Sequence, residues 1–343
     1  MKLDVLIRGA GPVGCAFALA LRTSGLRIAL LEQASAPPGF RPIALSYASR
    51  LILERLGAWD GLVVTPIERI LVTQAGSFGR TRLDAADAGV PALGYVTEYA
   101  ALLAQLRTQV HTTSEAETAT CIVHAEGSPH EEGKRYAQDA IVGLLSAEPP
   151  ATVTAFERFT PEGPLALLPY EGRYALIWSM RPERAQRLAA ATETEFLQAL
   201  QASAGNAIGS GTRIEKRALQ PLSLKVRGAR VDGNEVYIGN AAQTLHPVAG
   251  QGLNLGLRDA WDLARILRSA PEISAATLAR FAAQRRLDAS ATIRVTDFLA
   301  AGFAGDNTLL RAARGAALTA LDIFPGPRRF FARRMIFGAG ALP

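Results

Sequence analysis

The sequence predicts an α/β fold in which a parallel sheet with packed helices is interleaved with an antiparallel sheet and followed by C-terminal helices. Three observations predict it. A glycine-rich turn near the N-terminus joins an apolar strand to a helix of small residues. A second glycine-containing crossing from strand to helix lies at residues 239–256. Between the two, residues 138–179 contain short apolar or alternating runs at the spacing typical of antiparallel strands.

The first unit has the pattern of a Rossmann-like dinucleotide site. An apolar strand precedes the G-x-G-x-x-G turn formed by Gly9, Gly11 and Gly14, and a small apolar helix follows it. The next strand closes at Glu32, 18 residues after Gly14 (32 minus 14). Glycines at this spacing allow a tight turn and close approach of a pyrophosphate, while the acid hydrogen-bonds a ribose. Because an acid favours a free ribose over a 2′-phosphate, FAD or NAD fits better than NADP.

The second unit is a long ordered crossing. The apolar run at 236–238 reads as a buried strand, and residues 257–267 have the apolar spacing of a helix. Gly250 and Gly252 stand where that helix begins, so a ligand can approach the backbone closely. A helix N-terminus offers unpaired N–H groups and the positive end of a dipole. Such an end suits a flat group that accumulates negative charge, such as a reduced flavin ring.

The remaining elements follow in chain order from the same patterns. A loop at 34–40 and a helix at about 49–57 precede a strand at 67–73, a turn and loop at 76–87, and an amphipathic helix at 95–108. After a short segment, 110–120, an apolar strand leads to Glu126 and Gly127. The later elements are strands at 138–145, 153–159, 165–168, 174–179 and 220–226, and helices at 182–190, 194–204, 287–299 and 308–321.

These motifs carry a resemblance. The two glycine units, RPIALS at 41–46 and AFERFTPEGPLALLP at 155–169 resemble the FAD-dependent aromatic hydroxylases related to p-hydroxybenzoate hydroxylase, within the ubiquinone-biosynthesis UbiH/VisC group. The resemblance covers nearly the whole chain. Asn240, Gln243 and the pair His246-Pro247 are most similar to the branch that hydroxylates 2-polyprenyl-6-methoxyphenol. The resemblance implies an FAD-binding domain of the glutathione reductase/p-hydroxybenzoate hydroxylase type, interleaved with a sheet-rich substrate domain.

The resemblance also implies a set of cofactor-binding residues. They are Gly9, Gly11, Gly14, Glu32, Arg41, Gly239, Asn240, Gly250, Gly252, Leu253 and Asn254. In the family, the arginine matching Arg41 contacts the flavin nucleotide, and the backbone at 252–254 serves the pyrimidine edge of the flavin. Many relatives carry an aspartate at the Asn240 position, and asparagine still donates and accepts hydrogen bonds. Pro247 is expected to shape the oxygen pocket. His246 either hydrogen-bonds the substrate or is a fixed structural group.

The implied activity is hydroxylation of a polyprenylated phenol in ubiquinone biosynthesis. NADH or NADPH transiently reduces FAD, O₂ adds to form a flavin hydroperoxide, and one oxygen atom passes to the ring. Two departures from the family support an alternative, a degenerate flavin-binding accessory or scaffold protein in a quinone-biosynthesis complex. Residues 110–120 are shorter than the usual strand hairpin, and Glu126-Gly127 replaces Asp-Gly. A plain nicotinamide dehydrogenase is disfavoured because it does not need residues 239–256.

The composition limits the other function classes. The chain of 343 residues is 49% hydrophobic and 20% charged, with a net charge of +6. No apolar run approaches the ~20 residues of a membrane span, and the chain enters a strand too early for a signal peptide. Its two cysteines predict structural thiols in a reducing compartment and no metal site. We therefore expect a cytoplasmic protein, with peripheral contact at the cytoplasmic membrane face as a further hypothesis.

Part of the positive charge lies in the C-terminal segment. Its arginines alternate with apolar and aromatic residues; they are Arg311, Arg314, Arg328, Arg329, Arg333 and Arg334. This pattern indicates either a helical segment that packs its apolar face and solvates its arginines, or a patch that contacts a membrane surface or a partner enzyme. Nucleic acid is not expected, because no binding motif accompanies the basic residues. Glu157-Arg158 similarly has two interpretations, a pair facing the cavity or a cross-strand ion pair.

The domain boundaries follow from this order of elements. We expect an FAD-binding domain in three parts, a substrate domain in two parts and a helical end. The ranges are 1–66 (FAD-binding domain, first part), 67–94 (substrate-domain excursion), 95–136 (FAD-binding domain, second part), 137–230 (sheet-rich substrate domain), 231–285 (FAD-binding domain, third part) and 286–343 (C-terminal helical segment).

Overall fold

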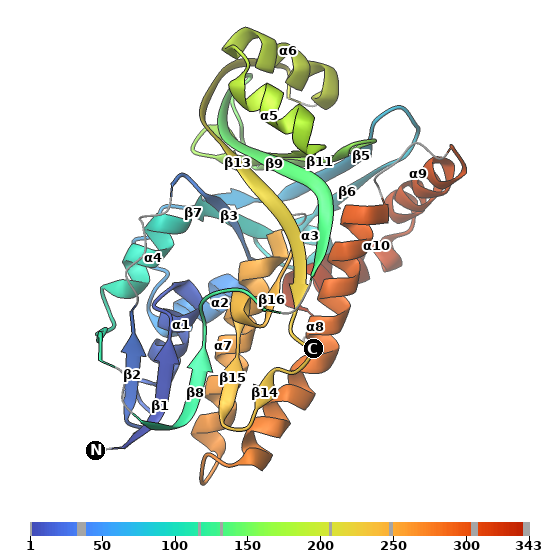
Figure 1. Cartoon of the computed structure of the whole chain (residues 1–343). Helices are drawn as coiled ribbons and strands as arrows, with labels where there is room; N and C mark the ends of the chain where they lie inside the picture. The colour runs from blue at the N-terminus through green and yellow to red at the C-terminus, as the bar shows by residue number, and fades with distance from the viewer. Residues whose placement is uncertain are drawn as a thin grey trace.

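The computed structural model describes residues 2–32, 39–115, 118–130, 133–205, 208–246, 250–302 and 308–338. Within these residues the strands form a five-stranded, an eight-stranded and a three-stranded sheet. Figure 1 shows the five-stranded sheet and its helices at one end of the molecule and the larger sheet above them. The α/β fold predicted from the sequence is confirmed.

The five-stranded sheet carries the nucleotide-type unit. Its order is β14-β15-β8-β1-β2, with β1, β2, β8 and β15 parallel and β14 antiparallel at the edge. The strands are β1 (Leu3–Arg8), β2 (Ile28–Leu31), β8 (Ala119–His124), β14 (Val231–Asp232) and β15 (Glu235–Tyr237). Helices α1 (Pro12–Leu21) and α7 (Gln251–Ser269) pack on one face. Because side chains alternate along a strand, Val5, Ile7 and Val123 are fully buried under these helices.

The eight-stranded sheet has the order β16-β13-β9-β12-β11-β10-β5-β6. Its pairs are antiparallel except β10 with β5, which run parallel. The strands are β5 (Arg69–Gln74), β6 (Arg80–Asp84), β9 (Lys134–Glu148), β10 (Thr154–Thr160), β11 (Gly163–Tyr170), β12 (Arg173–Met180), β13 (Ser210–Val226) and β16 (Gln243–Thr244). Helices α5 (Pro182–Ala190) and α6 (Glu193–Ala204) cover one face, where Trp178 and Phe196 meet edge to face.

The three-stranded sheet connects the two larger sheets. Its order is β3-β7-β4, formed by β3 (Pro42–Ser46), β4 (Thr65–Ile67) and β7 (Gly94–Glu98). Helix α2 (Tyr47–Leu56) follows β3 directly. The Ser46 side chain caps α2 by accepting from the Ser49 amide, and Gly57 ends it in the left-handed conformation. Hydrogen bonds from Ser46 and Ser49 to the Asn254 side chain hold the start of α2 beside the start of α7.

Two local predictions were wrong. Residues 76–87, expected to be turn and loop, contain β6 and the short helix α3 (Ala85–Ala88). Residues 95–108, expected to be one helix, begin as β7 and become helix α4 (Tyr99–Arg107) only afterwards. Tertiary pairing decides the second case, because β7 lies between β3 and β4 and hydrogen-bonds to both. Tyr95, Val96 and Thr97 also favour a strand.

The C-terminal helices close one side of the molecule. They are α8 (Ala275–Gly302), α9 (Thr308–Ile323) and α10 (Pro325–Phe337). Helix α8 packs on α7, α9 on β6, and α10 on α3. The proposed boundary at 285/286 falls inside α8, and the division into domains remains a proposal.

The segment between α4 and β8 is short. Thr113 bridges Leu31 in parallel, and β8 then pairs directly with β1. Residues 116–117 lie outside the described part of the chain.

Candidate active site

One large cavity, about 1180 Å³ in volume, lies where the three sheets and the C-terminal helices meet. Gly11 and Glu32 line it from the five-stranded sheet, Ser46 from the small sheet, and Glu157 from the eight-stranded sheet. Helices α9 and α10 add apolar side chains to the wall. A volume of this size holds an extended cofactor and part of a second molecule.

The three glycines of the N-terminal turn have different roles. Gly9 adopts a φ of +106°, and a side chain there would meet Glu126. A Cβ at Gly14 would lie 1.9 Å from the Gly9 carbonyl oxygen, so Gly14 permits the helix to pack on the turn. A Cβ at Gly11 would meet only the Tyr99 hydroxyl, at 3.5 Å. Gly11 therefore faces the cavity, at the N-cap of α1, where the helix amides are open to a ligand.

An ion pair that the sequence did not predict lies beside this turn. The Arg107 guanidinium contacts the Glu32 carboxylate at 2.7 Å and donates to the Ala10 carbonyl at 3.1 Å. Thr112 donates to the other Glu32 oxygen at 3.1 Å. Arg41 lies over the Tyr99 ring, 4.9 Å from its centroid, on the same side of the cavity. Arginine at the end of an amphipathic helix carries no special sequence signal, so the role of Arg107 emerges only in three dimensions.

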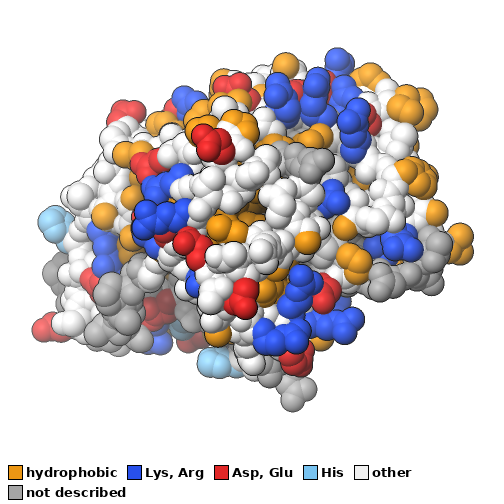
Figure 2. All heavy atoms as spheres, turned by 90° about the horizontal axis from the view of Figure 1, so that it is seen from above, with side chains coloured by type: hydrophobic (Ala, Val, Ile, Leu, Met, Phe, Trp, Pro, Cys, Tyr) orange, Lys and Arg blue, Asp and Glu red, His pale blue; other side chains and the backbone are white. Residues whose placement is uncertain are grey.

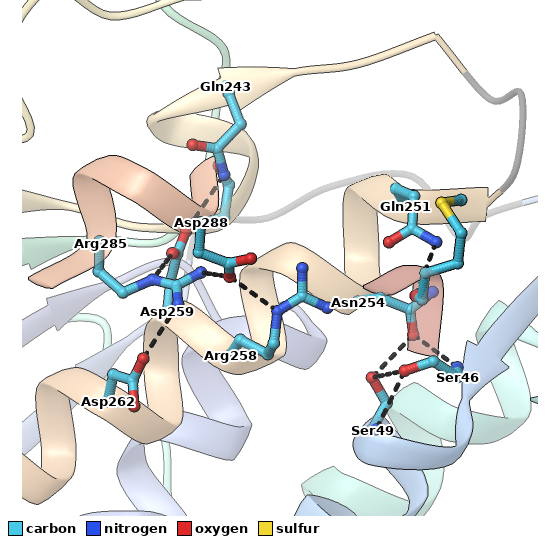
Figure 3. A network of polar contacts seen from close by, with 12 residues as sticks. Ser46, Ser49, Gln243, Gln251, Asn254, Arg258, Asp259, Asp262, Arg285 and Asp288 are labelled. Carbon is cyan, nitrogen blue, oxygen red and sulfur yellow. Dashed lines mark hydrogen bonds and ion pairs between the residues drawn. The ribbon is translucent and has the colours of Figure 1, made fainter. Parts of the chain in front are cut away.

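A buried network of charged side chains holds the turn that begins at Gly239 (Figure 3). The Asp259 carboxylate accepts hydrogen bonds from the Gly239 amide and the Gln243 side chain, each at 3.1 Å. Arg230 pairs with it at 3.0 Å and Arg285 at 2.8 Å. Burial opposes the charge on Asp259, but the two guanidiniums outweigh it and lower the pKa of this carboxyl. The short helix η1 (Gly239–Ala241) is therefore anchored to both α7 and α8.

The start of α7 combines an open backbone with a fixed side chain. Gly250 is left-handed, with a φ of +60°, and a Cβ placed on Gly252 would have no atom within 4 Å. The Asn254 side chain accepts from the Ser46 amide at 2.8 Å and the Ser49 hydroxyl at 2.7 Å. It also donates to the Gly250 carbonyl at 2.7 Å. The side chain of Asn254 thus ties α7 to β3 and α2, and its neighbour Leu253 lines the cavity.

The other predicted residues near this turn have varied surroundings. Asn240 is exposed, lines the cavity and donates to the Gly127 carbonyl at 2.6 Å. His246 lines the cavity with 1% exposure and meets the Tyr136 ring edge-on at 5.0 Å. Burial lowers the pKa of His246 to about 4 despite the nearby Asp297, so this histidine is neutral at physiological pH. Pro247 lies outside the described residues.

The eight-stranded sheet contributes a carboxyl whose role the sequence left open. Successive side chains of β10 alternate between the faces, so Glu157 lines the cavity and Arg158 points to the other side. There Arg158 reaches the Thr73 hydroxyl at 3.4 Å and passes close to Gly205. The interpretation that the pair faces the cavity is therefore right for Glu157 and wrong for Arg158. The interpretation as a cross-strand ion pair is wrong, because neither side chain forms an ion pair within the described residues. Among the described residues there is also no group of three His, Cys, Asp or Glu side chains placed to bind a metal.

Known proteins resemble this chain over most of its length. Residues 127–296 match the FAD binding domain family. Ubiquinone hydroxylase UbiL of Rhodospirillum rubrum is 30% identical, over 96% of this chain and 88% of its own. The chain belongs to the FAD-dependent ubiquinone-biosynthesis hydroxylases. The 3-demethoxyubiquinol 3-hydroxylase of Escherichia coli is another relative, 27% identical over 93% of this chain and 94% of its own.

Solved structures agree with the fold. Klebsiella pneumoniae HpxO, complexed with FAD and uric acid, superposes with a TM-score of 0.75 at 17% identity, over 96% of this chain and 97% of its own. The p-nitrophenol 4-monooxygenase PnpA from Pseudomonas putida superposes with a TM-score of 0.74 at 15% identity, over 97% of both chains. These structures support the fold alone, whereas the relationship to UbiL makes this hydroxylase an FAD-dependent monooxygenase by family. The branch within the family remains a prediction.

The residues of the cavity fit FAD. Gly11 and Gly252 are described helix-start glycines that line the cavity, and a side chain at either would enter open space, apart from the Tyr99 hydroxyl at 3.5 Å from Gly11. Both positions present backbone amides of a long helix, α1 or α7, to the same cavity. A pyrophosphate at the first and an electron-rich ring edge at the second would each meet the positive end of a helix dipole.

Proposed function

We propose that this hydroxylase inserts one oxygen atom from O₂ into the ring of a polyprenylated phenol, a precursor of ubiquinone. The observation that carries the proposal is the continuity of the cavity. It extends from the Gly11 turn to an apolar wall of the large sheet and on to Leu318, Phe331 and Met335 of the C-terminal helices. One end suits a nucleotide, the middle suits an aromatic ring, and the helical end suits an apolar tail.

The cofactor-binding residues are proposed from the geometry of this cavity. When bound, FAD supplies the transfer of electrons from NADH or NADPH and of oxygen to the ring. The α1 amides next to Gly11 would bind its pyrophosphate, and Glu32 and Arg41 would bind the nucleotide. The ion pair with Arg107 holds the Glu32 carboxylate in place. The open backbone at Gly252 would receive the flavin edge, while the Asp259 network holds Gly239 and Asn240 beside it.

An enzyme is favoured over an accessory protein. The shortened segment before β8 does not remove the cavity or its lining glycines. The relatives reported above are themselves named as hydroxylases. Glu126 lines the cavity beside Gly127, where the family usually has aspartate. In the resembling family this motif contacts the nucleotide and helps to bind the nicotinamide cofactor, so we expect this chain to depart most from the family pattern in the reduction step.

The decisive experiment is a single turnover. The FAD-loaded protein is reduced by NADH or NADPH without oxygen, and O₂ is then added with a short-tailed 2-prenyl-6-methoxyphenol. A product heavier by one oxygen atom, absent when O₂ is omitted, is the expected result. FAD binding and reduction followed by no oxygenated product would contradict the proposed activity.

We also propose that α9 and α10 contact an anionic membrane surface. Leu309, Ile323 and Phe330 are 79%, 64% and 63% exposed. Arg311, Arg328 and Arg329 stand among them in the sequence, and Arg334 follows. Figure 2, the molecule seen from above, shows Lys and Arg side chains beside exposed hydrophobic side chains. Part of the segment packs inward instead, because Ile336 is buried and Arg328 pairs with Asp87 at 2.9 Å. In the described residues, no helix is long and apolar enough to cross a bilayer.

Flotation with liposomes tests this surface. The wild type is expected to float with vesicles containing anionic lipid and to float less as salt rises. The variant Leu309→Ser/Phe330→Ser is expected to float less at the same salt, with Val63→Ser as an exposed control outside the helices. Equal flotation of all three proteins, or none, would end the membrane proposal. Contact with other quinone-biosynthesis enzymes stays a prediction.

A further inference from the structure

A row of side chains crosses the cavity wall of the large sheet at Glu157. In register across four neighbouring strands, Glu157 pairs with Val72 of β5 and Ala166 of β11, and Ala166 pairs with Ile177 of β12. Val72 pairs in turn with Thr81 of β6. Paired residues of a sheet point to the same face, and all five line the cavity. The immediate neighbours of the Glu157 side chain in this row are therefore apolar.

Within the described residues, the Glu157 carboxyl has no partner that accounts for its position. Its Oε1 atom is buried and makes no hydrogen bond within the described residues, and Glu157 forms no ion pair there. The Thr81 hydroxyl, two strands away in the same row, is also buried and makes no hydrogen bond to the residues that the structure describes. An unsatisfied buried polar group costs free energy, and one that faces a ligand cavity is expected to be satisfied by the ligand.

We propose that Glu157 is a catalytic residue that binds the phenolic hydroxyl of the substrate and removes its proton. This inference rests on the proposed function and specifies the orientation of the substrate. The phenol O–H bond breaks, the proton forms an O–H bond with a carboxylate oxygen of Glu157, and the electron pair stays on the phenolate oxygen. The phenolate donates electron density to the ring carbons ortho and para to it, which are the positions an electrophilic oxygen attacks.

The electrostatic surroundings suit this role. Burial alone raises the pKa of Glu157 to about 7, and a general base works best when its pKa is near the operating pH. Arg158, the adjacent charge on β10, lies on the opposite face. The other ionisable groups that line the cavity are Arg314 on α9, His246 near β16, and Glu32, Arg41, Tyr99, Arg107 and Glu126 toward the nucleotide end. None of them contributes to the raised pKa of Glu157.

The test measures binding without turnover. FAD-loaded protein, kept oxidised with no nicotinamide present, is titrated with 2-methoxyphenol by calorimetry between pH 5 and 9. A phenol with a pKa of about 10 stays neutral in solution over most of this range. The wild-type affinity is expected to rise with pH through about 7 as Glu157 ionises. Glu157→Gln is expected to show a flat profile and roughly tenfold weaker binding at pH 8.

Matched controls separate this role from a structural one. 1,2-Dimethoxybenzene has no hydroxyl, so wild type and Glu157→Gln should bind it alike at every pH. Glu183→Gln changes an exposed glutamate of α5 and should leave the profile of wild type unchanged. Glu157→Asp retains a base and should restore the pH dependence in part. Folding of each variant is checked by its melting temperature and by the absorbance of bound FAD.

The outcomes distinguish the two levels of the proposal. A Glu157→Gln protein that binds 2-methoxyphenol with the wild-type affinity and pH profile would overturn the role of Glu157 and leave the proposed function standing. Wild-type protein that binds FAD but no phenol at any pH would overturn the proposed substrate class, and the role of Glu157 with it.

Discussion

Gly14 and Gly252 illustrate two reasons for a glycine at a cofactor site. Gly14 is enclosed, since a Cβ would lie 1.9 Å from a backbone oxygen of Gly9. Gly252 is exposed to the cavity, and no atom lies within 4 Å of the position of a Cβ. The first glycine is needed for the protein to fold as it does. The second is not required by any contact within the described protein, so we propose that a glycine is needed there because FAD occupies the cavity.

Alanine substitutions should separate these two roles. Gly14→Ala is expected to lower the free energy of unfolding of the apoprotein by about 1–3 kcal/mol, because backbone must move. Gly252→Ala should leave that free energy unchanged or slightly higher, since alanine favours a helix, while weakening FAD binding. Urea unfolding of the apoproteins and fluorescence titration with FAD measure both quantities. Unaltered FAD affinity in Gly252→Ala would argue against the flavin position proposed here.

Glu157 also predicts a dependence of stability on pH. Its pKa is raised to about 7 in the folded protein from the usual value of 4.5. The folded state therefore holds the proton more tightly, and the stability that this proton confers is lost as pH rises from about 4.5 to 7. Glu157→Gln removes the dependence, and at pH 8 it should be more stable than wild type by up to about 3 kcal/mol. At pH 4 the two should be equal.

Unfolding of the apoprotein in urea at both pH values measures this difference. The contrast between the two pH values is the informative quantity, because a general packing effect of glutamine would appear at both. Wild type that is the more stable protein at pH 8 would mean that the carboxylate has a favourable partner in the folded state.

At the scale of elements, the Asp259 carboxylate of α7 connects η1 and α8 to this helix. Asp259 is fully buried and contacts Arg230, Arg285 and the Gly239 amide. Arg285 also pairs with the less deeply buried Asp262, at 3.0 Å. Removing the fully buried Asp259 leaves the other charges uncompensated, which costs more than removing Asp262, whose side chain is 21% exposed.

Asp259→Asn is expected to reduce the free energy of unfolding by about 3–5 kcal/mol. Asp262→Asn, on the same helix and with the same arginine partner, should cost about 1 kcal/mol or less. If Gly239 and Asn240 hold the cofactor, Asp259→Asn should also weaken FAD binding and Asp262→Asn should not. Denaturant unfolding and FAD titration test both variants. Equal losses of unfolding free energy in the two would show that the burial of the carboxylate does not determine its contribution to stability.

At the scale of the whole molecule, the cavity joins all three sheets and the C-terminal helices. A ligand that fills it binds the folded chain and not the unfolded one, so it stabilises the whole structure. At a free FAD concentration 100 times the dissociation constant, the expected gain is about 2.7 kcal/mol. Melting at several FAD concentrations measures it. A melting temperature that does not respond to FAD would contradict the proposed site, whereas a rise in only one of two separate transitions would show that the parts unfold independently.

The sequence by itself determined the features that depend on neighbouring residues. The Gly9–Gly14 turn, the strand before it, the helix after Gly250 and the interleaved α/β order are all local patterns of spacing and backbone freedom. The helix expected at 95–108 failed for the opposite reason, because pairing of β7 with two other strands outweighed its helical spacing.

Only the tertiary structure decided which side chains meet. Ser46 and Asn254 bond across 208 positions of sequence, and Arg107 reaches Glu32 from another element. Glu157 has apolar immediate neighbours on the cavity face because the register of β10 with β5 and β11 places Val72 and Ala166 beside it. Contacts of this kind depend on how distant segments pack, and no local pattern of residues specifies that.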